Sequence, residues 1–66
     1  MPKKIRELKA MLRQAGWIQV EGGKGSHTKW AHTLVQRRIT LSGKDGEDAK
    51  PYQQRDVNLG VSEARG

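Results

Sequence analysis

The sequence predicts an α+β domain with the element order α-β-β-β-α, in which two helices pack on one face of a three-stranded antiparallel sheet. Three observations predict it: an N-terminal stretch with helical spacing of its apolar residues, three short runs rich in β-branched and aromatic residues, and a second helical stretch that begins near a proline. We expect residues 1–66 to form a single domain, because a chain of 66 residues is too short for two cores.

The N-terminal segment is predicted to form an amphipathic helix over about residues 3–15. Its apolar residues recur at three- and four-residue spacing, which places them on one stripe: Ile5, Leu8, Met11, Leu12 and Ala15. Gly16 directly follows the last of them and suits the left-handed conformation that often ends a helix. The helix is therefore expected to stop there, with a basic outer face.

Two strands are expected at about residues 17–21 and 26–32, joined by a glycine-rich turn. In the second strand the two-residue period separates Trp30 from His27 and Lys29, which share the other face. Trp30 is the natural core residue of this strand. His27 and Lys29 are therefore expected to face outward.

A third strand is expected at about residues 37–41. The preceding segment, 33–36, has the composition of either a strand extension or a turn, and we favour the turn. If the second and third strands are neighbours, Arg38 shares the sheet face of His27.

A second helix is expected at about residues 50–59, with Pro51 in its first turn, where a missing N–H costs nothing. Glu47 and Asp48 precede this helix and suit its positive N-terminus. The clearest candidates for packing against the sheet are Tyr52 and Val57. Both helices need the same sheet face to bury their apolar residues, so the other face is left open.

The charge balance favours nucleic acid or another polyanion as partner, and the alternative interpretation is simply a soluble basic surface. Thirteen Lys and Arg oppose seven Asp and Glu, giving a formal net charge of +6. The absence of cysteine excludes disulfides, thiolate metal sites and cysteine nucleophiles. No run approaches the roughly 18 apolar residues needed to cross a membrane. We expect a cytoplasmic protein with no cofactor, no metal and no membrane contact.

The candidate site is the segment 24–30, which places one histidine among cations beside a flexible glycine. Cleaving an RNA phosphodiester needs a base, an acid and cations around the phosphate, and His27 can act as base or acid. The candidates for holding the phosphate, through side chains or closely approaching backbone, are Lys24, Gly25, Ser26, Lys29 and Arg38. The competing interpretation is that His27 is a solvated residue near a turn.

His32 is the only other histidine, and strand alternation places it on the opposite face from His27. A two-histidine acid and base pair and a shared metal site are therefore disfavoured. We prefer a structural or rim role for His32, with RNA contact as the alternative. The second proton carrier is not identified, and Lys24 and Lys29 are candidates only by their nearness along the chain.

These features together resemble the HicA toxins of bacterial and archaeal toxin–antitoxin modules. They are the amphipathic helix, a Gly-Trp pair entering the first strand, the Gly25-Ser26-His27 motif with an aromatic at Trp30, and the short second helix. The resemblance extends roughly from Ile5 to Leu59.

The resemblance implies a fold similar to double-stranded-RNA-binding domains and a ribosome-independent mRNA endonuclease that arrests translation and growth. His27 matches the family's catalytic histidine and Gly25 its motif glycine. The implied partner is a HicB antitoxin that covers the active surface, and operator DNA is contacted only indirectly, through the complex with the antitoxin. Two other classes of function fit the same charge and fold: a non-catalytic RNA-binding module and a basic protein-interaction subunit.

Two positions depart from the family pattern. His32 is followed by Thr33, where many members have proline. The second helix is expected to end at Gly60, leaving residues 60–66 as a frayed tail, where relatives often continue with more apolar residues.

Overall fold

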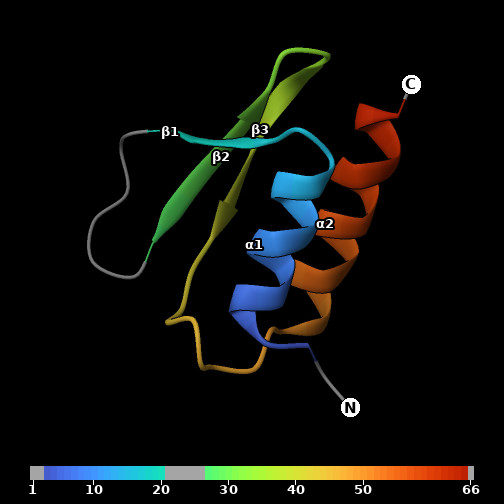
Figure 1. Ribbon diagram of the computed structural model, residues 1–66. Helices are drawn as coiled ribbons and strands as arrows, with labels where there is room; N and C mark the ends of the chain where they lie inside the picture. The colour runs from blue at the N-terminus through green and yellow to red at the C-terminus, as the bar shows by residue number, and fades with distance from the viewer. Residues whose placement is uncertain (1–2, 21–26, 66) are drawn as a thin grey trace.

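The computed structural model describes residues 3–20 and 27–65, and it confirms the predicted α+β class and element order (Figure 1). The elements are α1 (Ile5–Gln14), β1 (Ile18–Val20), β2 (Thr28–His32), β3 (Val35–Leu41) and α2 (Pro51–Ala64). Neither helix within these ranges has the length and apolar character that a membrane span requires.

The three strands form one antiparallel sheet in the order β1-β2-β3, so β2 is the central strand. Trp30 lies in the middle of β2, opposite Gln19 on one side and Ile39 on the other. Both helices lie on the same side of the sheet and run in the same direction (Figure 1). Within residues 3–20 and 27–65, no helix covers the other face of the sheet, as predicted.

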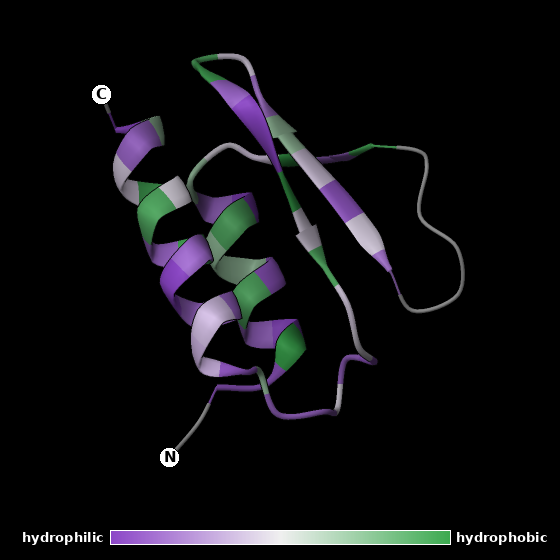
Figure 2. Cartoon of the chain, turned by 180° about the vertical axis from the view of Figure 1, so that it is seen from behind, coloured by the Kyte–Doolittle hydropathy of each residue, from purple (hydrophilic) through white to green (hydrophobic). Residues whose placement is uncertain are grey.

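The core lies between the helices and the sheet. Its buried hydrophobic residues are Ile5, Leu8, Leu12, Trp17, Trp30, Ile39, Leu41, Ala49 and Val57. Both helices mix hydrophobic and hydrophilic residues along their length, as amphipathic helices do (Figure 2). Trp17 and Trp30 are only 1% and 0% exposed, so their role is core packing and not base stacking.

The two indoles dominate the stability of such a small core. Truncating a buried tryptophan to alanine costs about 3–5 kcal/mol. A domain of this size has a total stability of roughly 3–10 kcal/mol. Truncating either tryptophan alone is therefore expected to remove a large part of the free energy of unfolding.

The loop between β3 and α2 caps the beginning of α1. The backbone N–H groups of Ile5 and Arg6 donate to the carbonyl oxygens of Glu47 and Asp45, at 3.0 and 3.2 Å. These bonds satisfy donors that the first turn of a helix leaves unpaired. The loop thus ties α1 to a segment about forty residues away in the chain.

The side chains of Glu47 and Asp48 bind groups outside the following helix, which corrects the prediction that they serve its N-terminus. Glu47 accepts the backbone N–H of Lys44 at 2.9 Å within the loop itself. Asp48 pairs with Lys4 at 2.5 Å and Asp45 pairs with Lys9 at 2.6 Å. The sequence pattern favoured α2 because α2 is next along the chain. The fold brings the N-terminal ends of both helices together, so Lys4 and Lys9 come within ion-pair distance of these acids.

The turn between β2 and β3 is shorter than predicted. It consists of Thr33 and Leu34, and β3 already begins at Val35, which pairs with His32. The prediction of a turn through residue 36 is therefore wrong. Val35 is β-branched and packs against the edge of the core, which favours the extended conformation.

The second helix is longer than predicted, and Gly60 lies within it. Helix α2 continues to Ala64, so the frayed tail expected from residue 60 is wrong for residues 60–64. Val61 and Ala64 pack against the core, which supplies the apolar contacts that hold this last part in the helix. The helix thus extends past its glycine.

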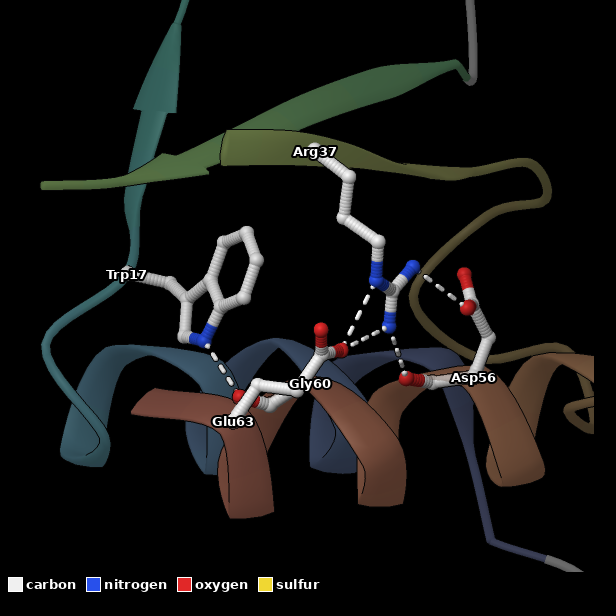
Figure 3. A network of polar contacts seen from close by, with 5 residues as sticks. All are labelled: Trp17, Arg37, Asp56, Gly60 and Glu63. Carbon is white, nitrogen blue, oxygen red and sulfur yellow. Dashed lines mark hydrogen bonds and ion pairs between the residues drawn. The ribbon is translucent and has the colours of Figure 1, made fainter. Parts of the chain in front are cut away.

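Gly60 is the point of closest approach between α2 and the sheet. A Cβ atom at this position would lie 2.4 Å from Ile39 Cδ1 and 3.1 Å from the ring of Trp17. Trp17 Nε1 also donates a hydrogen bond to the Gly60 carbonyl oxygen at 3.2 Å (Figure 3). Glycine is needed here for space, not for a helix-ending conformation.

The first turn of α2 packs through a different residue from the one predicted. Val57 is buried as expected, but Tyr52 is 58% exposed. Gln53 takes the inward position, where its Nε2 donates to the Ser42 carbonyl oxygen at 2.9 Å. A polar side chain is stable there because its amide is hydrogen-bonded.

We predict that Gly60→Ala destabilises the protein. Alanine is normally better than glycine in a helix interior by up to about 1 kcal/mol. Here the added methyl group overpacks a closed contact with Ile39 and the rigid ring of Trp17, which costs about 1–3 kcal/mol. The midpoint of urea unfolding should fall.

The matched control for this prediction is Gly46→Ala. A Cβ atom at Gly46 has no neighbour within 4 Å, so this variant should be at least as stable as the parent. Equal midpoints for the Gly60 and Gly46 variants would contradict the close-packing role.

We predict that the contribution of Asp45 to stability disappears in acid. The hydrogen bond from Lys9 and the charge of the same lysine lower the pKa of Asp45 from its ordinary value of 3.8. A lowered pKa in the folded state means that the stabilisation is present above the ordinary pKa and is lost as pH falls through the lowered one. The difference in melting temperature between the parent and Asp45→Asn should be largest near neutral pH and should vanish toward pH 2. A difference that does not change with pH would contradict the pairing.

Candidate nucleic-acid-binding and catalytic site

His27 lies at the entrance to the central strand. It directly precedes Thr28, the first residue of β2, and it is exposed to solvent. Thr28 pairs with Leu41 at the end of β3, so His27 lies at one end of the β2–β3 ladder. Its exposure agrees with the prediction that it faces outward. Lys24, Gly25 and Ser26, the other predicted residues of this segment, lie outside the described residues.

Lys29 and Arg38 lie on the open face of the sheet. Lys29 pairs with Thr40 and alternates with the buried Trp30, so it points away from the helices. Arg38 is two residues before Thr40 and is exposed. Strand alternation therefore gives it the same face as Lys29, as predicted.

The described candidate residues His27, Lys29 and Arg38 are spread along the sheet and are not gathered around one point. Lys29 is two residues beyond His27 along β2. Arg38 lies where the β2–β3 register shifts, beyond Trp30. At about 3.3 Å per residue, roughly 13 Å of strand separates the positions of His27 and Arg38. An extended polyanion laid along β2 would pass all three side chains in turn.

In the part of the chain that the structure describes, the carboxylates that form hydrogen bonds or ion pairs bind groups other than Lys29 and Arg38. The carboxylates of α2 bind Arg37, and those of the loop before α2 bind Lys4, Lys9 and the backbone N–H of Lys44. Glu7 accepts the backbone N–H of Lys4. Among residues 3–20 and 27–65, no carboxylate pairs with Lys29 or Arg38. The open face is thus electrostatically suited to an anion.

The two consecutive arginines of β3 have different roles. Arg37 points toward α2, where its guanidinium binds Asp56 at 2.7 Å and Glu63 at 2.8 Å (Figure 3). The hydrogen bond that Arg37 donates to Glu63 is the main cause that raises the pKa of Arg37. Arg37 therefore joins β3 to α2, while Arg38 remains on the open face.

His32 has a structural role, as preferred from the sequence. Its Nδ1 accepts the backbone N–H of Leu34 at 3.0 Å, so the ring proton lies on Nε2. Nε2 in turn lies 3.0 Å from the carbonyl oxygen of Ala15, to which it donates. The ring also packs against Trp17, with 5.6 Å between centroids. Both nitrogens are used in holding the turn after β2 to the end of α1.

Gly16 ends α1 in the predicted left-handed conformation, with φ of +95°. It also makes room for His32, because a Cβ atom at this position would lie 2.9 Å from Nε2. The predicted helix end and the position of His32 are therefore parts of one arrangement.

One residue of the site was not identified from the sequence. The Thr28 hydroxyl oxygen accepts a hydrogen bond from Trp30 Nε1 at 3.1 Å, directly beside His27. Alternation shows that residues 28 and 30 share a face, and this is the only signal that could have found the pair. A groove of about 420 Å³ lies away from this site, between the C-terminal ends of the two helices. None of the predicted catalytic or substrate-binding residues lines it. Its lining residues are Met11, Gln14, Ala15, Val61 and Arg65.

These observations define a class of protein: a small basic α-β-β-β-α domain with a cationic sheet face and one exposed histidine immediately before its central strand. Residues 5–60 match the family model described as the HicA toxin of bacterial toxin-antitoxin systems. The chain belongs to this family, which gives it the role of a toxin with a partner antitoxin. No curated protein and no solved structure matches the chain.

We predict that Arg37 and Arg38 differ in their effect on stability. Arg37→Gln removes two partly exposed ion pairs and should lower the free energy of unfolding by roughly 1 kcal/mol at low salt, and by less at high salt. Arg38→Gln makes the same change of charge on the open face and should have almost no effect. Urea unfolding at two salt concentrations measures both. Equal losses for the two variants would show that Arg37 does not join the strand to the helix.

Proposed function

We propose that this toxin is a metal-independent endoribonuclease that cleaves mRNA with His27 as its general acid or base, and that it thereby inhibits translation and growth. The observation that carries the proposal is the position of His27. It is exposed at the entrance to the central strand and lies in line with Lys29 on a face where described carboxylates pair with neither Lys29 nor Arg38.

The chemistry follows from what an imidazole and nearby cations supply. His27 removes the proton from the attacking 2′-hydroxyl or delivers one to the leaving 5′-oxygen. Lys29 stabilises the negative charge that develops on the phosphoryl oxygens, and Arg38 binds the strand farther along. The 2′-hydroxyl attack leaves a 2′,3′-cyclic phosphate and a free 5′-hydroxyl.

The family's toxin–antitoxin arrangement supports the biological part of the proposal. A toxin of such a pair needs an activity that stops growth and a partner that prevents it. We propose that a HicB-like antitoxin covers the face that carries His27. Contact with operator DNA then arises only through the complex with the antitoxin. A non-catalytic RNA-binding module is the second candidate, because the line of Lys29 and Arg38 would also hold RNA without cleaving it.

We predict that His27→Ala abolishes cleavage. Purified protein should cut mRNA in the presence of EDTA, and the variant should be at least about 100-fold slower, the usual contribution of one general acid or base. Its RNA affinity and melting temperature should stay close to those of the parent, because His27 is exposed and its removal opens no cavity.

The product ends and the salt dependence separate the alternatives. Cyclic phosphate ends support the 2′-hydroxyl mechanism, whereas 5′-phosphate ends contradict it. Salt-sensitive RNA binding without products, even over long incubation, would favour the non-catalytic module. Equal cleavage by the parent and His27→Ala would remove His27 from the mechanism.

A further inference from the structure

Thr28 connects the candidate catalytic residue to the core of the protein. It is the first residue of β2 and follows His27 directly. Its hydroxyl oxygen accepts the hydrogen bond from Trp30 Nε1 at 3.1 Å. Trp30 is completely buried, and a buried indole N–H needs an acceptor. Thr28 is therefore hydrogen-bonded to a fully buried core tryptophan, Trp30.

Trp30 is itself fixed from several sides. It pairs with Gln19 of β1 and with Ile39 of β3, so it lies in the interior of the sheet. The guanidinium of Arg13, near the end of α1, lies 5.2 Å from the centroid of its ring, within the range of a cation–π contact. These contacts fix the position of the Trp30 indole. Its hydrogen bond to the Thr28 hydroxyl therefore restricts the position of the Thr28 side chain.

A threonine suits this position better than other small polar residues. Its β-branched side chain favours the extended conformation and restricts χ1, which keeps the hydroxyl directed toward the indole. Thr28 also forms the first backbone pair of the β2–β3 ladder, opposite Leu41. Ladder pairing and the side-chain bond together fix the backbone where His27 joins the sheet.

We infer that Thr28 is a positioning residue for His27, acting through its hydrogen bond to Trp30. This inference depends on the proposed function of His27. A general acid or base must be held close to its productive geometry, and a displacement of 1 Å can reduce the rate by a factor of about 100. The Thr28 side chain shares the sheet face of Trp30, opposite the face of Lys29. It fixes the backbone from which the imidazole projects.

The test compares Thr28→Val with Thr28→Ser. Valine keeps the shape but cannot accept the indole hydrogen bond, whereas serine keeps the acceptor. Thr28→Val should lower kcat for RNA cleavage by at least about 10-fold with little change in KM, and Thr28→Ser should restore most of the rate. Thr33→Val makes the same chemical change at the exposed turn after β2 and should leave kcat unchanged.

A second measurement does not depend on activity. In NMR spectra, Thr28→Val should shift the His27 ring and amide resonances and lower the order parameter of the His27 amide, and Thr28→Ser should leave them near the parent values. If Thr28→Val does not fold, Thr28→Ser and Thr28→Ala carry the same comparison, because they differ only in the hydroxyl.

The outcomes separate this inference from the proposed function. If the parent does not cleave RNA, the proposed function fails, and the NMR comparison still decides whether Thr28 orders His27. If Thr28→Val lowers only the melting temperature, or changes KM alone, with kcat and the His27 resonances as in the parent, the positioning role is overturned.

Discussion

The contact between Gly60 and Trp17 is the constraint on which the rest of the structure depends. Only a third of the chain is hydrophobic and phenylalanine is absent, so two buried tryptophans must supply much of the core volume. An indole in the core also needs an acceptor for its N–H, and Trp17 finds one in the Gly60 carbonyl. The helix can come close enough only because residue 60 has no side chain. This approach places the last turns of α2, with Val61 and Ala64, against the core.

The close packing of α2 against the sheet also determines where the charged side chains lie. With α2 close to β3, Arg37 reaches Asp56 and Glu63, and both acids of that helix are drawn to the helix side of the sheet. The loop before α2 uses its acids on α1. The net charge of +6 is therefore distributed unevenly, and Lys29 and Arg38 lie on a face where the described carboxylates do not neutralise them. Structural ion pairs on one side of the sheet thus create the anion-compatible surface on the other.

Periodicity was sufficient to predict the element order, the burial of Trp30 and the different surroundings of His27 and His32. It could not distinguish the two kinds of glycine. Gly16 ends a helix at φ of +95°, whereas Gly60 lies inside a helix and is required by Ile39 and Trp17, which are distant in sequence. Arg37 and Thr28 were missed for a related reason: their roles depend on partners whose side-chain positions only the folded chain defines.

The contacts of the two histidines explain why we propose His27, and not His32, as the proton carrier. A proton carrier must exchange its proton during the reaction. In His32, Nδ1 accepts the backbone N–H of Leu34 and Nε2 donates to the carbonyl oxygen of Ala15, so both ring nitrogens are already engaged in structural hydrogen bonds. His27 lies outside that arrangement, at an exposed position. Because the chain has only these two histidines and no cysteine, the second proton carrier of the proposed reaction must be another kind of group, such as a lysine, a hydroxyl, a carboxylate or water.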